Sequence, residues 1–223
     1  MSTYLRPTAE IAPRALLTPN PAEAMALAQE LIDGPLMANH NHGLWGYSGP
    51  AKADGAQLTI QSTGIGGPSA AAVLFDLARH GVQRAVCVGR AEPLNGAIGA
   101  GARVLVIRAL RRDGASRALG EGPAALPHPE LCEGLRASLG EGCVPATVAS
   151  LDVRPADPAD AGADGALAWD LASAAVLAAG ERAGVAAGVA LLAATGDPEA
   201  SREGLLELGA AGAQALLGAA VRG

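Results

Sequence analysis

The residues best suited to hold a small polar ligand are Gly64, Gly66 and Gly67, which separate an alternating stretch, residues 57–62, from a helical one, residues 69–80. Glycines let backbone N–H groups come close to a ligand, and the beginning of a helix favours an anion or a polar ribose. The run lacks the ending of a Walker loop and the spacing of a dinucleotide-binding fingerprint. Two interpretations stay open: a ligand-binding turn, or a tight strand-to-helix turn that needs positive φ.

Two charged residues stand near the ends of apolar strand patterns. Arg90 follows the run 84–89, and α/β folds place ligand groups at such strand ends. Its alternative is an ion pair with nearby Glu92. Asp197 follows the run 185–194, where it would serve as an acid facing a cleft or, because Pro198 comes next, as a helix cap. Spacing alone favours the ion pair and the cap.

Histidines and cysteines give no metal-binding pattern. His40 and His42 would face the same side of a strand, and the alternative is that both are exposed loop residues. A metal would need a third ligand that the sequence does not supply, so we expect no metal. The three cysteines are far apart, which argues against a disulfide framework or a zinc site.

These residues need a scaffold of alternating strands and helices. Short apolar runs alternate with longer Ala- and Leu-rich stretches along all 223 residues, and no linker divides them. This order predicts an α/β fold whose sheet is covered on both faces. We expect a single domain over residues 1–223, with residues 1–14 as an N-terminal extension. Half of the residues are hydrophobic but only 2% are aromatic, and 30 are Gly, which favours close packing of helices on the sheet.

Charge and hydropathy exclude several classes of partner. The chain has 16 Lys and Arg against 22 Asp and Glu, a net charge of −6, and no basic stripe, so nucleic acid is not an expected partner. No apolar stretch reaches the ~20 residues that span a bilayer. Residues 1–11 are polar, unlike a secretory signal. We expect a cytoplasmic protein that does not bind membranes.

The order of the motifs resembles the family-1 nucleoside phosphorylases, the group of uridine phosphorylases and hexameric purine nucleoside phosphorylases. STGIGGPSAA at 62–71 is similar to the family's strand–GIGGPS–helix, NGAI at 95–98 to its GAI motif, and Arg111 with DGAS at 113–116 to its R-x-DGAS run. The likeness spans about residues 15–215. It implies a nucleoside phosphorylase-like domain in which a mixed central sheet forms a distorted barrel flanked by helices, within a homodimer or homohexamer.

The resemblance also implies an activity. A pentosyltransferase of this family cleaves the N-glycosidic bond of uridine or a purine nucleoside, with inorganic phosphate as co-substrate and no cofactor. Asp197 lies about where purine enzymes carry the acid that protonates the leaving base. The implied substrate-binding residues come from three strand ends: Thr63, Gly64, Ile65, Gly66, Arg90, Ala91, Glu92, Asp170 and Leu171.

Departures from the family pattern leave other activities open. The family's phosphate arginines correspond here to Glu23 and Cys87, and a third, lent by a neighbouring subunit, falls near His42. We expect Arg90 and His42 to bind phosphate in their place. The ribose-binding glutamate falls on Ala172. Two alternatives follow: a nucleoside hydrolase that uses water, or a non-catalytic homologue that binds a ligand or only assembles.

Overall fold

The computed structural model describes residues 4–94, 96, 98–157 and 161–217, so Asn95 and Ala97 of the NGAI motif lie outside the described residues. Its strands are β1 (Arg14–Thr18), β2 (Leu36–Asn39), β3 (Gly46–Pro50), β4 (Gln57–Ser62), β5 (Arg84–Pro93), β6 (Arg103–Arg111), β7 (Ala124–Ala125), β8 (Val144–Ser150), β9 (Ala168–Asp170) and β10 (Ala186–Ala193). Its α-helices are α1 (Pro21–Leu31), α2 (Gly67–Arg79), α3 (Gly114–Leu119), α4 (Pro129–Leu139), α5 (Ser173–Ala183) and α6 (Pro198–Leu217), with short 3-10 turns η1 (Asn41–Gly43) and η3 (Ala163–Gly165).

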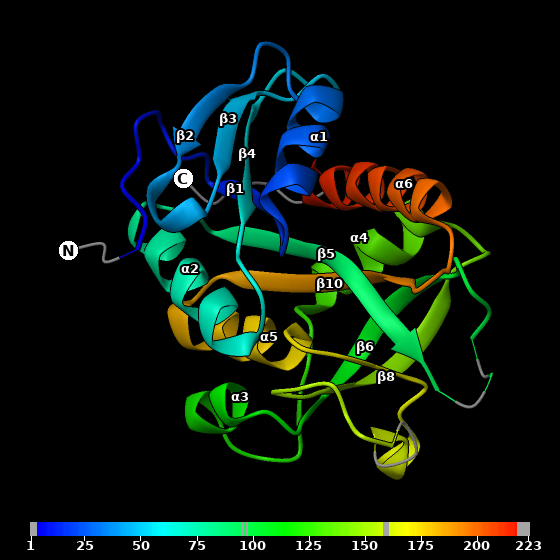
Figure 1. Ribbon diagram of the computed structural model, residues 1–223. Helices are drawn as coiled ribbons and strands as arrows, with labels where there is room; N and C mark the ends of the chain where they lie inside the picture. Colours follow the sequence, from blue (N-terminus) through cyan, green and yellow to red (C-terminus); the bar gives the residue numbers. More distant parts are fainter. Residues whose placement is uncertain (1–3, 95, 97, 158–160, 218–223) are drawn as a thin grey trace.

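Five strands close into a barrel, and the sheet continues beyond it (Figure 1). Strand β10 is parallel to β5 and antiparallel to β6. The ring then runs through β8 and β9 and returns to β5. From β5 the sheet extends through β1, β4, β3 and β2. The expected α/β class with a mixed sheet forming a distorted barrel is confirmed.

Helices cover the sheet on both sides, as the alternating sequence predicts (Figure 1). Helices α2 and α5 pack together over one apolar core, and α1, α4 and α6 cover a second one. Glycines allow these helices to approach closely. A Cβ added to Gly209 of α6 would lie 2.1 Å from Leu27 of α1, and one added to Gly212 would lie 2.9 Å from Leu16 of β1. Small residues therefore replace aromatic bulk in this core.

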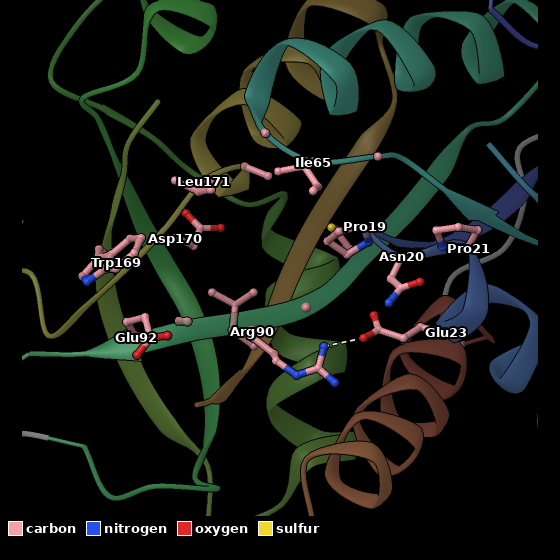
Figure 2. A pocket seen from close by; sticks show the side chains of 17 residues that line it. Pro19, Asn20, Pro21, Glu23, Ile65, Arg90, Glu92, Trp169, Asp170 and Leu171 are labelled. Carbon is pink, nitrogen blue, oxygen red and sulfur yellow. Dashed lines mark hydrogen bonds and ion pairs between the residues drawn. The ribbon is translucent and has the colours of Figure 1, made fainter. Parts of the chain in front are cut away.

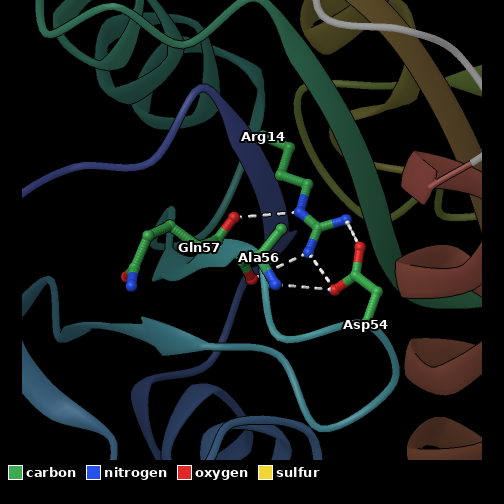
Figure 3. A network of polar contacts seen from close by, with 4 residues as sticks. All are labelled: Arg14, Asp54, Ala56 and Gln57. Carbon is green, nitrogen blue, oxygen red and sulfur yellow. Dashed lines mark hydrogen bonds and ion pairs between the residues drawn. The ribbon is translucent and has the colours of Figure 1, made fainter.

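The segment expected to be an N-terminal extension packs onto the domain in its described part. Leu5 is 1% exposed, and its backbone N–H donates to Asp76 of α2. Residue 14 already belongs to β1. Arg14 is buried there, and all three of its side-chain nitrogens donate: Nη1 and Nη2 to Asp54 at 2.8 and 2.6 Å, Nη2 also to the Ala56 carbonyl, and Nε to the Gln57 carbonyl (Figure 3).

Within the described residues, no helix combines the length and apolarity that crossing a membrane requires.

Candidate functional site

Three strand ends and the turn after β1 surround a cavity of about 580 Å³, here named the strand-end cavity (Figure 2). Eight of the nine predicted substrate-binding residues line it, and only Thr63 does not. Nine further residues line it, among them Asn20, Glu23, Cys87 and Trp169. Residues from four separate parts of the chain therefore meet at one opening.

The glycine turn after β4 forms one wall of this cavity. Gly64 and Gly66 have φ of 74° and 87°, a region that favours glycine. The Ser69 hydroxyl donates to the Thr63 carbonyl at 2.6 Å, and a Cβ on Gly64 would lie 2.7 Å from that hydroxyl oxygen. The predicted positive-φ turn is confirmed. It presents Ile65, which is 82% exposed, at the edge of the cavity.

Arg90 at the end of β5 is bonded across the fold. It forms an ion pair with Glu23 of α1 (Figure 2), and its Nε donates to Ser201 of α6 at 2.7 Å. Thr18 fixes the other oxygen of Glu23 by a 2.9 Å hydrogen bond. The predicted ion pair with Glu92 is wrong, because the Arg90 side chain extends toward α1 and α6 instead. The arginine expected to bind phosphate is thus already neutralised by a carboxylate.

Asp170, at the end of β9, is buried and tightly hydrogen-bonded. One carboxylate oxygen accepts from the Ser150 hydroxyl at 2.6 Å, and the other accepts from the backbone N–H and hydroxyl of Ser173 at 2.8 and 2.7 Å. Burial raises the pKa of Asp170 above its ordinary value, an effect that these hydrogen bonds oppose. Asp170 therefore joins β8, β9 and the start of α5 behind the cavity wall.

Cys87 contributes a neutral side chain to the cavity. Burial, together with the nearby charge of Asp170, raises the pKa of the Cys87 thiol to about 12, so it remains protonated near neutral pH. The ionisable lining residues other than this thiol are Glu23, Glu92, Asp170 and Arg90. Three acids and one base give a formal charge of −2, which opposes the entry of an anion.

His42 and Asp197 do not line the strand-end cavity. His42 lies in η1 with φ of 55°, and its ring contacts Tyr4 at a centroid distance of 5.9 Å. Asp197 is exposed and accepts from the backbone N–H of Glu199 at 2.9 Å, so the predicted helix cap of α6 is confirmed. Their roles with phosphate and the leaving base stay predictions.

Among the described residues, no group of three or more His, Cys, Asp or Glu side chains is arranged to hold a metal ion.

Sequence reasoning did not select Asn20, and it gave Trp169 no role of its own, although this residue belongs to the strand end 167–170 that was expected to border the ligand. Asn20 caps α1 by accepting from Ala22 N–H at 2.9 Å. Trp169 is one of two tryptophans and directly precedes Asp170, which was predicted to bind substrate. This position in the sequence could have identified it as a lining residue.

Known proteins resemble this chain in part of its sequence and in its fold. No protein-family model matches the sequence. The chain is 34% identical over 83 residues to a DeoD-type purine nucleoside phosphorylase of Clostridium perfringens and, with the same figures, to one of Geobacillus kaustophilus. Each match covers 37% of this chain and 34% of the relative. The chain thus matches about a third of the length of these curated relatives.

The structural likeness extends much further along the chain. A uridine phosphorylase from Vibrio fischeri superposes with a TM-score of 0.85, over 93% of this chain and 92% of that one, at 21% sequence identity. The chain therefore has the nucleoside phosphorylase fold, and the sequence matches relate it to the family-1 nucleoside phosphorylases.

Proposed function

We propose that this chain binds a nucleoside in the strand-end cavity and cleaves its N-glycosidic bond with inorganic phosphate, as a pentosyltransferase. The observation that carries the proposal is the convergence of eight predicted substrate-binding residues, from three strand ends, on one cavity. Its volume of about 580 Å³ falls within the range of small-molecule sites. The relatives' names support the same class of reaction.

Each wall of the cavity has a role in this proposal. Ile65 and Leu171 offer apolar contacts to the base, and Glu92 accepts hydrogen bonds from ribose hydroxyls. Asp170, whose oxygens are already bonded to serines, holds the β9 wall in position. Asp197 lies outside the lining of the cavity, and its expected role as the acid that protonates the leaving base, where bond cleavage develops negative charge, stays a prediction.

Phosphate must compete with Glu23 for Arg90. A charge-assisted hydrogen bond to arginine contributes roughly 1.5–3 kcal/mol. Because Arg90 already makes such a bond to the largely buried carboxylate of Glu23, it attracts a phosphate dianion less strongly. We propose that His42 of a neighbouring copy adds a second cation within a cytoplasmic homodimer or homohexamer. Sedimentation as a monomer at micromolar concentration would remove His42 from the site.

The Glu23–Arg90 ion pair favours a second candidate function, one in which the cavity does not bind phosphate. Water would then attack the nucleoside as in a hydrolase, or the cavity would bind its ligand without cleaving it. The acidic balance of the lining side chains is compatible with a neutral nucleoside and opposes a dianion.

The test is release of free base from a panel of purine and pyrimidine nucleosides, with and without phosphate, at high protein concentration. Phosphate-dependent release that falls in Arg90→Ala supports phosphorolysis, and Arg6→Ala serves as an exposed control outside the cavity. Equal release in phosphate-free buffer assigns a hydrolase. Nucleoside binding without release assigns the non-catalytic alternative.

A further inference from the structure

A second cavity, of about 450 Å³, is lined by four arginines, and we name it the arginine cavity. Its lining includes Arg108, Arg111, Arg112 and Arg117, with Asp164 as the single acid. It shares no lining residue with the strand-end cavity. Four arginines and one aspartate give a formal charge of +3, in a chain whose net charge is −6.

Arg111 is the buried member of this group, and its charge is poorly compensated. The residue is 6% exposed, and one terminal nitrogen donates to the Ser116 carbonyl at 2.7 Å. Its Nε has no hydrogen-bond acceptor among the described residues. The carboxylate it pairs with, Glu181, lies 3.8 Å away and is 79% exposed. A buried guanidinium in this state is unfavourable without an anion nearby.

The contrast with Arg14 shows that this state is not general for buried arginines in this chain. Arg14 is equally buried, yet it is bonded to both oxygens of Asp54 and to two carbonyls (Figure 3). Gly120 leaves room beside the Arg111 guanidinium, because a Cβ there would lie 2.8 Å from both terminal nitrogens.

The other arginines surround Arg111 with different degrees of restraint. Arg108 is half-buried, and its side chain forms no hydrogen bond or ion pair among the described residues. Arg117 is exposed, and its Nε donates to the Arg111 carbonyl at 2.9 Å, which holds the side chain beside the cavity. Arg112 is fixed by Asp164 at 2.9 Å. Two arginines are thus positioned by the protein, while Arg108 and the terminal nitrogens of Arg117 remain available to a ligand.

We propose that the arginine cavity binds a small polyanion that carries two or more phosphate or carboxylate groups. The planar guanidinium donates paired hydrogen bonds to either oxyanion. A ligand with two or three negative charges would balance the formal charge of the lining and supply the acceptors that the arginines lack. The binding is independent of any reaction in the strand-end cavity.

The test is calorimetric titration of the full chain with pyrophosphate and, separately, with citrate at low ionic strength. We expect wild type to bind one polyanion per chain and the double variant Arg108→Gln/Arg117→Gln to bind about 10-fold or more weakly. The charge-matched control Arg6→Gln/Arg136→Gln removes two exposed arginines outside both cavities and should change the affinity less than about 2-fold.

Three results would overturn the proposal: no binding of either anion by wild type, equal losses in the double variant and its control, or loss of binding in Arg90→Ala, which would place the anion in the strand-end cavity. Tighter binding of pyrophosphate assigns a phosphorylated ligand, and tighter binding of citrate assigns a polycarboxylate. Both variants are first compared with wild type by thermal unfolding, so that a folding defect is not read as lost binding.

Discussion

The two cavities of this protein have opposite charge and are built in different ways. The strand-end cavity has a formal lining charge of −2, and two of its three acids, Glu23 and Asp170, accept hydrogen bonds from Thr18, Ser150 and Ser173. The arginine cavity has a formal charge of +3, and two of its arginines lack an acidic partner among the described residues. The resemblance of fold points to the strand-end cavity as the ligand site, whereas the arginine side chains without an acidic partner lie in the arginine cavity.

The strand-end cavity therefore has a different charge from the one that the resemblance to phosphate-using enzymes implies. Glu23 stands where the resemblance predicts a phosphate-binding arginine, and it pairs with the one arginine that lines the cavity. A neutral ligand fits this balance better than an anion does. Charge rather than shape is therefore the property to test first.

The largest effect is expected from Asp170→Ala, which tests whether the strand-end cavity depends on a buried carboxylate. The substitution leaves the Ser150 hydroxyl and the Ser173 hydroxyl and N–H without their acceptor. We expect a loss of about 3–5 kcal/mol in the free energy of unfolding. Urea denaturation measures it, with Asp33→Ala as the control, because Asp33 is exposed and lies outside both cavities. A loss equal to that of the control would contradict a structural role for Asp170.

A smaller loss of unfolding free energy is expected from Gly64→Ala. Its matched control is Gly122→Ala, at a glycine that lines the arginine cavity. Gly64 and Gly122 both have positive φ, 74° and 78°, so both substitutions cost roughly 1–2 kcal/mol of backbone strain. Only Gly64→Ala also displaces Ser69, because nothing lies within 4 Å of a Cβ at Gly122. Thermal unfolding should therefore show a greater loss for Gly64→Ala, of about 1 kcal/mol more.

Glu23→Gln tests directly whether Glu23 keeps phosphate from the strand-end cavity. The change releases Arg90 from its ion pair and reduces the formal lining charge from −2 to −1. We expect phosphate affinity to rise about 10-fold, equivalent to about 1.4 kcal/mol. Calorimetry on wild type, Glu23→Gln and Arg90→Ala measures it. Identical affinities in all three would exclude this pair from any phosphate site.

The pH dependence of stability should carry a signature of Asp170. Its pKa is raised in the folded state, so its contribution to stability is present below the unfolded pKa of about 3.9 and is lost as the pH rises through the folded pKa. Wild type should therefore lose stability relative to Asp170→Asn as the pH rises from about 4 toward neutrality. Urea unfolding at several pH values tests this, since contributions of other groups cancel in the difference. A constant difference would show that the pKa is not raised.

The smallest effect is expected on the stability of Arg108→Gln/Arg117→Gln. Neither arginine has an acidic partner among the described residues, and Arg117 is exposed. We expect a change in unfolding free energy within about 0.5 kcal/mol. Differential scanning calorimetry measures it. A large loss would mean that the arginine cavity is a structural element rather than a ligand site.

The sequence by itself determined the features that depend on neighbours along the chain. Alternating apolar runs predict the α/β class, because side-chain periodicity is a local property of strands and helices. The glycines at 64 and 66 and the aspartate at 197 predict a positive-φ turn and a helix cap, and both are present. The resemblance of motifs added the barrel and the strand ends that line the cavity.

Only the tertiary structure decided which charges meet. Arg90 and Glu23 are 67 residues apart, and they pair because β5 lies beside β1, which leads into α1. The sequence did show four arginines within residues 108–117, but not that the barrel brings them against Asp164, 52 residues beyond Arg112. Electrostatic partners are chosen by distance in space, and the strand pairing that sets this distance comes from packing of the whole sheet rather than from spacing along the chain.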